Sequence, residues 1–172
     1  MLRSRPPPAR RSDKPDELQT SLVRLVENVV VVVHTAFSPS DDEWDAYLQT
    51  LVAAANAHGG DLTRCRQLMM TDGGGPNSVQ RLSAQRTLAA VNGEAMPLAV
   101  VSSSPAARGI VTAFNWMKMN IRMFHPMEVG SAFEFLHVGK GTRDAIWDAL
   151  EAIQDELGIL ETIQVARDTL RP

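Results

Sequence analysis

The sequence predicts an α/β fold, with a mainly parallel or mixed sheet of about five strands and helices on both faces. Segments with apolar residues at helical spacing alternate with short β-branched segments across short connections, which is typical of this class. In addition, residues 29–33 are five consecutive valines, as in a strand that helices cover on both faces. The expected order is ββαβαβαβα, followed by one or two C-terminal helices.

The first two strands are expected in a hairpin within 17–37, "ELQTSLVRLVENVVVVVHTAF". The polar pair Glu27-Asn28 interrupts the apolar pattern and suits a tight turn. The predicted strands are therefore residues 18–26 and 29–35, with Val31 in the core.

The next segment, "SPSDDEWDAYLQTLVAAANAHGG", changes to a helical period. Ser40 and Glu43 match a capping box, and Gly59-Gly60 can end the helix with positive φ. The predicted buried face comprises Trp44, Tyr47, Leu48, Leu51, Val52 and Ala55.

The strand and helix pattern then repeats, which implies right-handed crossovers between parallel strands. The expected helix at 77–91 has Val79 and Leu82 on its apolar stripe and Arg86 at the edge of that stripe. The elements expected in this part are a strand at 67–71, this helix, a strand at 98–102, a helix at 105–119 and a strand at 121–124.

Two or three further helices are expected towards the C-terminus. Residues 126–138 predict one with Ala132, Phe133 and Leu136 inward, and residues 142–158 predict a second with a stripe ending at Gly158. Residues 159–170 repeat the apolar spacing and predict an additional helix. We therefore divide the chain into a disordered basic tail rich in proline and arginine (1–16), an α/β domain (17–138) and a C-terminal helical extension (139–172).

Charge and composition exclude several function classes. The overall net charge is −3, and residues 1–14 carry +4. Residues 15–172 therefore carry −7, and this acidic body argues against a nucleic-acid surface. The longest apolar run has five residues, against about 20 for a membrane-spanning helix, so no transmembrane segment is expected. With one cysteine and no apolar stretch of a secretory signal, we expect a cytoplasmic location.

No catalytic pattern is present. The four histidines lack metal-ligand spacing, and the sequence has neither a Walker motif nor a dinucleotide fingerprint. Cys65 lies between Arg64 and Arg66, which could depress the pKa of its thiol, but the sequence supplies no identified base. We therefore expect no enzyme activity, no cofactor and no metal site.

Three stretches, "TDGGGPNSVQR", "PLAVVSSSPAARGIVTAFNWM" and "IRMFHPMEVGSAFEFL", resemble the STAS-like domains of bacteria, relatives of the anti-sigma-factor antagonists and of the CRAL-TRIO lipid-transfer fold. The resemblance covers residues 17–137. It implies a non-enzymatic regulatory domain that binds a protein partner in a bacterial signalling pathway. The alternative that it allows is a carrier or sensor of a small acidic or lipid-like ligand.

The resemblance also implies a phosphorylation site. In anti-sigma-factor antagonists the corresponding loop carries an aspartate followed by a serine that a partner kinase phosphorylates. Asp72 matches the aspartate, whereas Gly73 and Gly74 stand where hydroxyl residues would be expected. Ser78 is the nearest substitute and is the candidate phosphorylation site.

Two loops leave the carboxyl ends of neighbouring predicted strands, where ligands of parallel α/β sheets collect. Three successive glycines can turn backbone N–H groups towards an anion, and the serines of the second loop add hydroxyl donors. The alternative is that the glycines and Pro76 only make a sharp turn before a helix. The candidate ligand- or partner-binding residues are Asp72, Gly73, Gly74, Ser78, Arg81, Ser102, Ser104 and Arg108.

Overall fold

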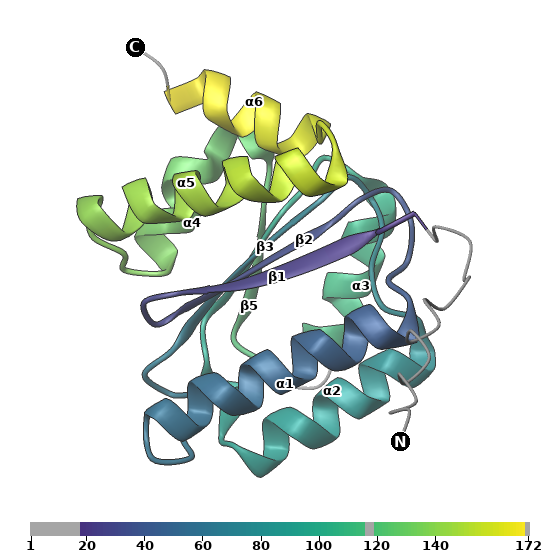
Figure 1. The fold of residues 1–172 in the computed structure, drawn as a ribbon, viewed down its shortest axis with the longest axis vertical. Helices are drawn as coiled ribbons and strands as arrows, with labels where there is room; N and C mark the ends of the chain where they lie inside the picture. The colour runs from purple at the N-terminus through teal and green to yellow at the C-terminus, as the bar shows by residue number, and fades with distance from the viewer. Residues whose placement is uncertain (1–17, 116–118, 171–172) are drawn as a thin grey trace, which may run out of the picture.

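The computed structural model describes residues 18–115 and 119–170, and the predicted tail at 1–16 lies outside the described residues. Figure 1 shows three layers, with a five-stranded sheet between two layers of helices. The strands are β1 (Ser21–Val26), β2 (Val29–His34), β3 (Arg66–Thr71), β4 (Leu98–Val101) and β5 (Ile121–Phe124).

The strands lie in the sheet in the same order as in the chain, β1-β2-β3-β4-β5. β1 and β2 form the predicted antiparallel hairpin, with Val26 opposite Val29, and the other neighbours are parallel. The predicted α/β class with a mixed five-stranded sheet is therefore confirmed.

One face of the sheet is covered by α1 (Asp41–Ala57), α2 (Ser78–Ala90) and α3 (Pro105–Asn115). Successive right-handed crossovers that step in one direction along a sheet all pass over the same face. Val30 and Val32 of β2 point to this layer and pack in one cluster with Leu51 of α1 and Leu88 of α2. A short 3₁₀ helix, η1 (Gly93–Ala95), precedes β4, and residues 116–118 of the predicted third helix lie outside the described residues.

The opposite face is covered by α4 (Val129–Phe135), α5 (Lys140–Leu157) and α6 (Glu161–Leu170), after a 3₁₀ helix, η2 (Pro126–Glu128). Val29, Val31 and Val33 point to this layer. They form one buried cluster with Leu150 of α5 and Ile163 of α6, among others. Residues of α5 and α6 thus contribute to the main core of the sheet.

The start of α1 also holds the first strand in place. Ser40 and Glu43 form the predicted capping box. The Glu43 carboxylate additionally accepts hydrogen bonds from the backbone N–H groups of Thr20 and Ser21, at 2.7 and 3.0 Å, and from the Thr20 hydroxyl at 2.7 Å. One carboxylate therefore joins the N-terminus of α1 to the beginning of β1.

The predicted orientation of α2 is wrong. Its buried residues are Gln80, Ala84 and Leu88, whereas Val79 and Leu82 are 75% and 47% exposed. Gln80 is tolerated inside because its side-chain amide donates to the Pro39 carbonyl at 3.0 Å. The inner face of α2 thus combines Gln80 and Ala84 with Leu88, and Val79 and Leu82 face outward.

A substitution in α5 tests whether the C-terminal helices belong to the core. Leu150 is fully buried against the valines of β2, so Leu150→Ala should lower the free energy of unfolding by about 2–5 kcal/mol through lost burial and a cavity. The exposed neighbour Asp148 is the control, and Asp148→Ala should change stability by no more than about 0.5 kcal/mol. Urea unfolding measures both, and a cost below about 1 kcal/mol for Leu150→Ala would contradict this packing.

Candidate functional site

The two loops that follow β3 and β4 lie side by side at the carboxyl edge of the sheet, as predicted. Met70 is paired with Val101 in the sheet. Just beyond this pair, the buried Ser102 hydroxyl donates a hydrogen bond to the Thr71 carbonyl at 2.6 Å. Ser102 therefore joins the two loops, and its hydroxyl is used inside the protein.

The glycine loop directs its first N–H groups into the protein. The N–H of Gly73 donates to the Thr71 hydroxyl at 3.0 Å, and the N–H of Gly74 donates to the Thr35 carbonyl at 2.9 Å. The Thr71 hydroxyl in turn donates to the Gly74 carbonyl at 2.6 Å. These donors are not free for a phosphate, so the turn interpretation describes this loop better than the anion cradle.

Two of the glycines are required for different reasons. Gly73 has φ of +127°, which L side chains rarely adopt. Gly74 lies so close to the loop between β2 and α1 that a Cβ atom would be 1.9 Å from the Phe37 carbonyl oxygen and 2.5 Å from that of Thr35. Gly74 is therefore a packing glycine.

Asp72 is the N-terminal cap of a distant helix. Its two carboxylate oxygens each accept one backbone N–H of α6, from Glu161 and Thr162, both at 2.9 Å. The Thr162 hydroxyl also donates to the Thr71 carbonyl, at 3.0 Å. A carboxylate is favoured there because the first N–H groups of a helix lack intrahelical partners. Asp72 thus joins the carboxyl end of β3 to α6.

The remaining candidates separate into internal and exposed groups. Ser104 accepts the Ala106 N–H at the start of α3, at 3.2 Å, and Arg81 donates to the Pro76 carbonyl at 2.9 Å. Ser78 is the first residue of α2 and is exposed. Arg108 is exposed on α3. Only Ser78 and Arg108 of the predicted set present their side chains freely to solvent.

Arg108 lies on the wall of a surface groove that sequence reasoning missed. This groove, here called the β5 groove, has a volume of about 540 Å³ and runs between α3 and β5. Besides Arg108 it contains Arg122, His125 and Glu128. No local sequence pattern predicts that these residues lie together. The groove depends on the position of β5 as the last strand of the sheet, beside α3.

His34 is a polar side chain buried at the end of β2. It is the last residue of β2, is fully buried, and neither ring nitrogen has a hydrogen-bond partner among the described residues. Burial lowers its pKa to about 4, and the nearby Glu43 carboxylate opposes this only in part. The ring is therefore neutral at pH 7.

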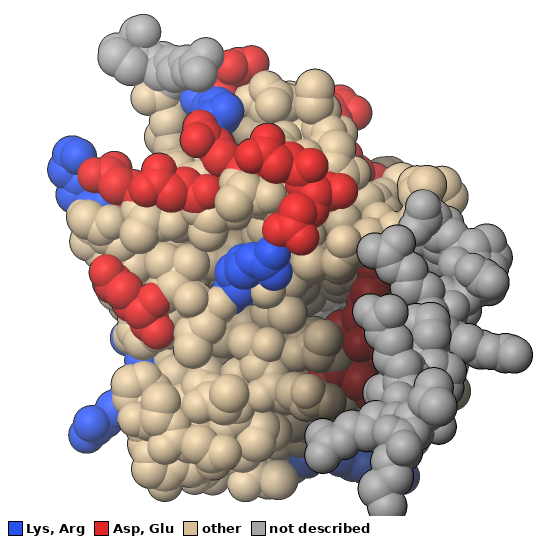
Figure 2. All heavy atoms as spheres, viewed as in Figure 1, with Lys and Arg blue, Asp and Glu red and all other residues tan. Residues whose placement is uncertain are grey.

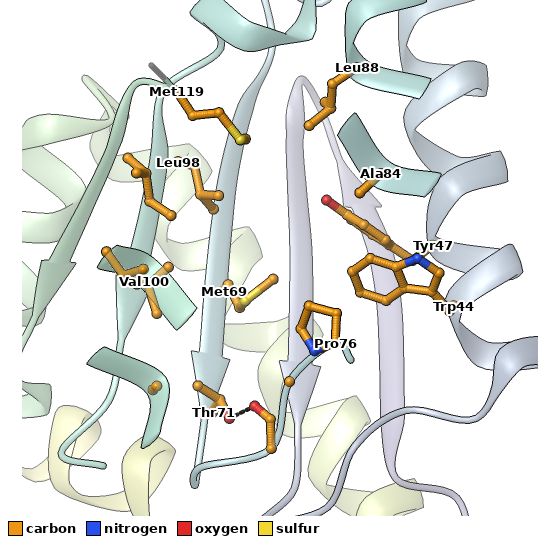
Figure 3. A pocket seen from close by; sticks show the side chains of 15 residues that line it. Trp44, Tyr47, Met69, Thr71, Pro76, Ala84, Leu88, Leu98, Val100 and Met119 are labelled. Atoms are coloured by element: carbon orange, nitrogen blue, oxygen red, sulfur yellow. Dashed lines mark hydrogen bonds between the residues drawn. The ribbon is translucent and has the colours of Figure 1, made fainter. Parts of the chain in front are cut away.

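Between α2, α3 and the sheet there is a small apolar cavity of about 30 Å³. Figure 3 shows Trp44, Met69 and Pro76 around it, with the Thr71–Gly74 hydrogen bond at one end. Sites for small molecules usually have about 300–1,000 Å³. This cavity is too small to enclose a lipid-like ligand.

The environment of Cys65 does not favour a reactive thiol. Cys65 is buried, and burial raises the pKa of its thiol despite the nearby Arg66 cation, so the reactive thiolate is disfavoured. Among residues 18–115 and 119–170, no three His, Cys, Asp or Glu side chains are placed to hold a metal ion. Over the same residues no helix has the length and apolar character needed to cross a membrane.

The two helical layers differ in surface charge. Figure 2 shows a row of acidic side chains across α5, whose exposed acidic residues are Asp144, Asp148, Glu151, Asp155 and Glu156. The part of the α1 and α2 surface that is not behind grey atoms in the same view is mostly uncharged, although Asp45 of α1 and Arg86 of α2 are exposed. There Val52 of α1 is 39% exposed and lines a shallow hollow that also includes Thr87 of α2. We call this surface, with Val52, Val79 and Leu82, the α1–α2 face.

A comparison of the chain with models of protein families gives no match, and comparisons with curated proteins and with solved structures also give none.

The packing role of Gly74 can be tested by adding one methyl group. Gly74→Ala places a Cβ atom against backbone oxygens that cannot rotate away, so we expect a loss of at least about 2 kcal/mol in unfolding free energy. Gly109 of α3 has no atom within 4 Å of an added Cβ, and Gly109→Ala should instead stabilise by about 0.5–1 kcal/mol. Chemical denaturation distinguishes the two, and equal stabilities would contradict the close approach at Gly74.

His34 predicts a loss of stability in mild acid. Its pKa is lowered from 6.5 to about 4 in the folded state, so between these values the unfolded chain binds a proton that the native protein does not. The free energy of unfolding should therefore decrease as the pH is lowered, and this group should account for a decrease of about 2 kcal/mol from pH 7 to pH 5. His34→Val removes the titrating group, and its pH 7 to pH 5 loss in urea unfolding should be smaller than that of the wild type by this amount. Identical losses would show that His34 is protonated without penalty.

Proposed function

We propose that this chain is a non-enzymatic, STAS-like regulatory domain that acts in a bacterial signalling pathway by binding a protein partner through the α1–α2 face. The main support is that α2 carries apolar side chains on both sides. Its inner side packs on the sheet through Leu88, while Val79 and Leu82 face solvent. A helix that is apolar on two sides normally has two neighbours.

The charge distribution favours this face over the opposite layer. The α5 surface is a row of carboxylates, and charged residues are depleted from the cores of protein interfaces. The α1–α2 face has fewer charged residues, with Asp45 and Arg86 exposed on it, and it includes the hollow between the two helices. Its composition is therefore closer to that of an interface core than the acidic surface of α5 is.

Ser78 gives this surface a means of regulation. It is exposed and directly precedes Val79 at the N-terminus of α2. The first turn of α2 contains no acidic residue, so a phosphate there would interact favourably with the helix dipole while adding charge beside the apolar anchor. Phosphorylation would leave the fold intact and change the surface that a partner meets.

The proposal includes a cytoplasmic location, which a single, buried cysteine suits. The described elements, a hairpin followed by parallel strands with crossovers on one face, cover most of the three stretches on which the resemblance rests. The small size of the internal cavity favours a binding domain over a carrier that encloses its ligand.

A pair of matched substitutions tests the α1–α2 face. Leu82→Asp places a charge on it and should reduce recovery of native partners, measured by affinity capture and quantitative mass spectrometry, at least about tenfold, as expected for a hot-spot position. Leu170 of α6 is equally exposed, 45% against 47%, and Leu170→Asp should leave recovery unchanged.

Both variants should retain the circular dichroism spectrum of the wild type, because both side chains are in solvent contact. Equal recovery with the two variants would exclude the α1–α2 face as the interface. A loss with Leu170→Asp alone would assign the interface to the opposite layer.

A further inference from the structure

β1 is an edge strand of the sheet. Among the described residues it pairs only with β2, and Figure 1 shows it between α1 and α5. In an antiparallel pair, alternate residues direct both of their backbone groups at the partner strand. The Thr35 N–H donates to the Thr20 carbonyl at 2.9 Å, so the even-numbered residues of β1 face β2. The N–H and carbonyl groups of Ser21, Val23 and Leu25 therefore point away from the sheet.

Side chains already occupy two of these outward backbone groups. The Glu43 carboxylate of α1 accepts the Ser21 N–H at 3.0 Å. In the middle of the strand, the Arg24 guanidinium donates to the Val23 carbonyl at 3.0 Å. An incoming strand would need both groups, because main-chain pairing supplies the affinity of strand addition.

Arg24 is held at the edge by the opposite helical layer. A second nitrogen of its guanidinium forms an ion pair with Glu156 of α5. The two helical layers thus both help to close this edge, through Glu43 on one side and through Glu156 and Arg24 on the other. The side chains of the Arg24–Glu156 pair are 40% and 46% exposed. Ion pairs in contact with solvent are weak, so this closure is reversible.

The composition of β1 would otherwise suit pairing with another strand. Residues 21–26 read SLVRLV, with four apolar residues, no proline and a single charge, that of Arg24. A long apolar edge without protection is a template for pairing with another chain. β5, at the other edge of the sheet, has only four residues. Arg24 is therefore both the one charge of β1 and the group that covers its central carbonyl.

We propose that the β1 edge is a latent interface for a second copy of this chain, and that Arg24 and Glu43 keep it closed. When Arg24 leaves the Val23 carbonyl, two β1 strands can pair antiparallel about a twofold axis at Val23. Outward N–H groups of one copy then face outward carbonyls of the other, as the isologous interface of a twofold dimer requires. A second copy is favoured over an extended foreign peptide, because β1 is already ordered in its hairpin and loses little conformational entropy on pairing.

Analytical ultracentrifugation of the full chain measures this monomer–dimer equilibrium. Arg24→Ala frees the Val23 carbonyl and should raise the association constant of the dimer about tenfold or more, because additional main-chain hydrogen bonds can form between the copies. The matched control is Arg108→Ala, which removes an exposed arginine from α3 and should leave the association constant at the wild-type value.

A proline at position 23 assigns the dimer to the β1 edge. The Val23 N–H points away from β2, so proline removes an outward donor and leaves the hydrogen bonds to β2 in place. Added to Arg24→Ala, Val23→Pro should return the association constant to the wild-type value, whereas Val23→Ala, which keeps the N–H, should not. Circular dichroism and thermal unfolding check that the variants fold.

Amide hydrogen exchange gives a second readout that does not depend on the proline variant. In Arg24→Ala, the outward amides of Val23 and Leu25 should gain protection as the protein concentration rises, because they become bonded to the second copy. An equal association constant for Arg24→Ala and the wild type would overturn the proposal. So would a dimer that leaves these two amides unprotected, or a wild type that is already paired through β1.

This interface and the proposed function can fail independently. The β1 edge does not include the α1–α2 face, so monomeric Arg24→Ala would leave partner capture through that face unaffected. Equal partner recovery with Leu82→Asp and Leu170→Asp would exclude the α1–α2 face and leave the pairing of β1 untouched.

Discussion

The burial of β2 is the constraint on which the rest of the structure depends. Its five valines are completely buried, with three facing one helical layer and two facing the other. A strand of this composition is stable only between two apolar layers. The chain meets this requirement with α1 to α3 on one side and α4 to α6 on the other, so the segment beyond residue 139 is as necessary as the crossovers.

The strand order determines where a site can form. In many α/β proteins a crevice opens where the strand order reverses and neighbouring crossovers pass to opposite faces. Here the order follows the chain without reversal, and α1, α2 and α3 all cover one face. The loops at the carboxyl edge consequently pack on one another and on α6 through Ser102, Gly74 and Asp72. Concave and apolar surfaces occur elsewhere, on the α1–α2 face and beside β5.

The sequence predicts the elements of this fold well because period and capping are local properties. The valine run, the Ser40–Glu43 capping box and the turn at Glu27 could all be read from neighbouring residues. The exposed face of α2 was predicted incorrectly, because Gln80 becomes acceptable inside through hydrogen bonds to Pro39 and Asp41, which are distant in the sequence. The role of Asp72 depends on α6, where Glu161 is 89 residues away in the sequence. The role of Gly74 depends on the loop before α1, where Phe37 is 37 residues away. No pattern within the glycine loop contains that information.

The shared core has a consequence for the order of events during synthesis. The cluster around Val29, Val31 and Val33 includes side chains as far along the sequence as Ala166. The hydrogen bonds of Asp72 likewise form only after residues 161 and 162 have been synthesised. While the ribosome is still translating α5 and α6, one face of the most apolar strand therefore has no cover. A nascent chain in this state exposes β-branched surface that favours aggregation. Rapid release, or transient shielding by a chaperone until α6 emerges, would protect the chain at that stage.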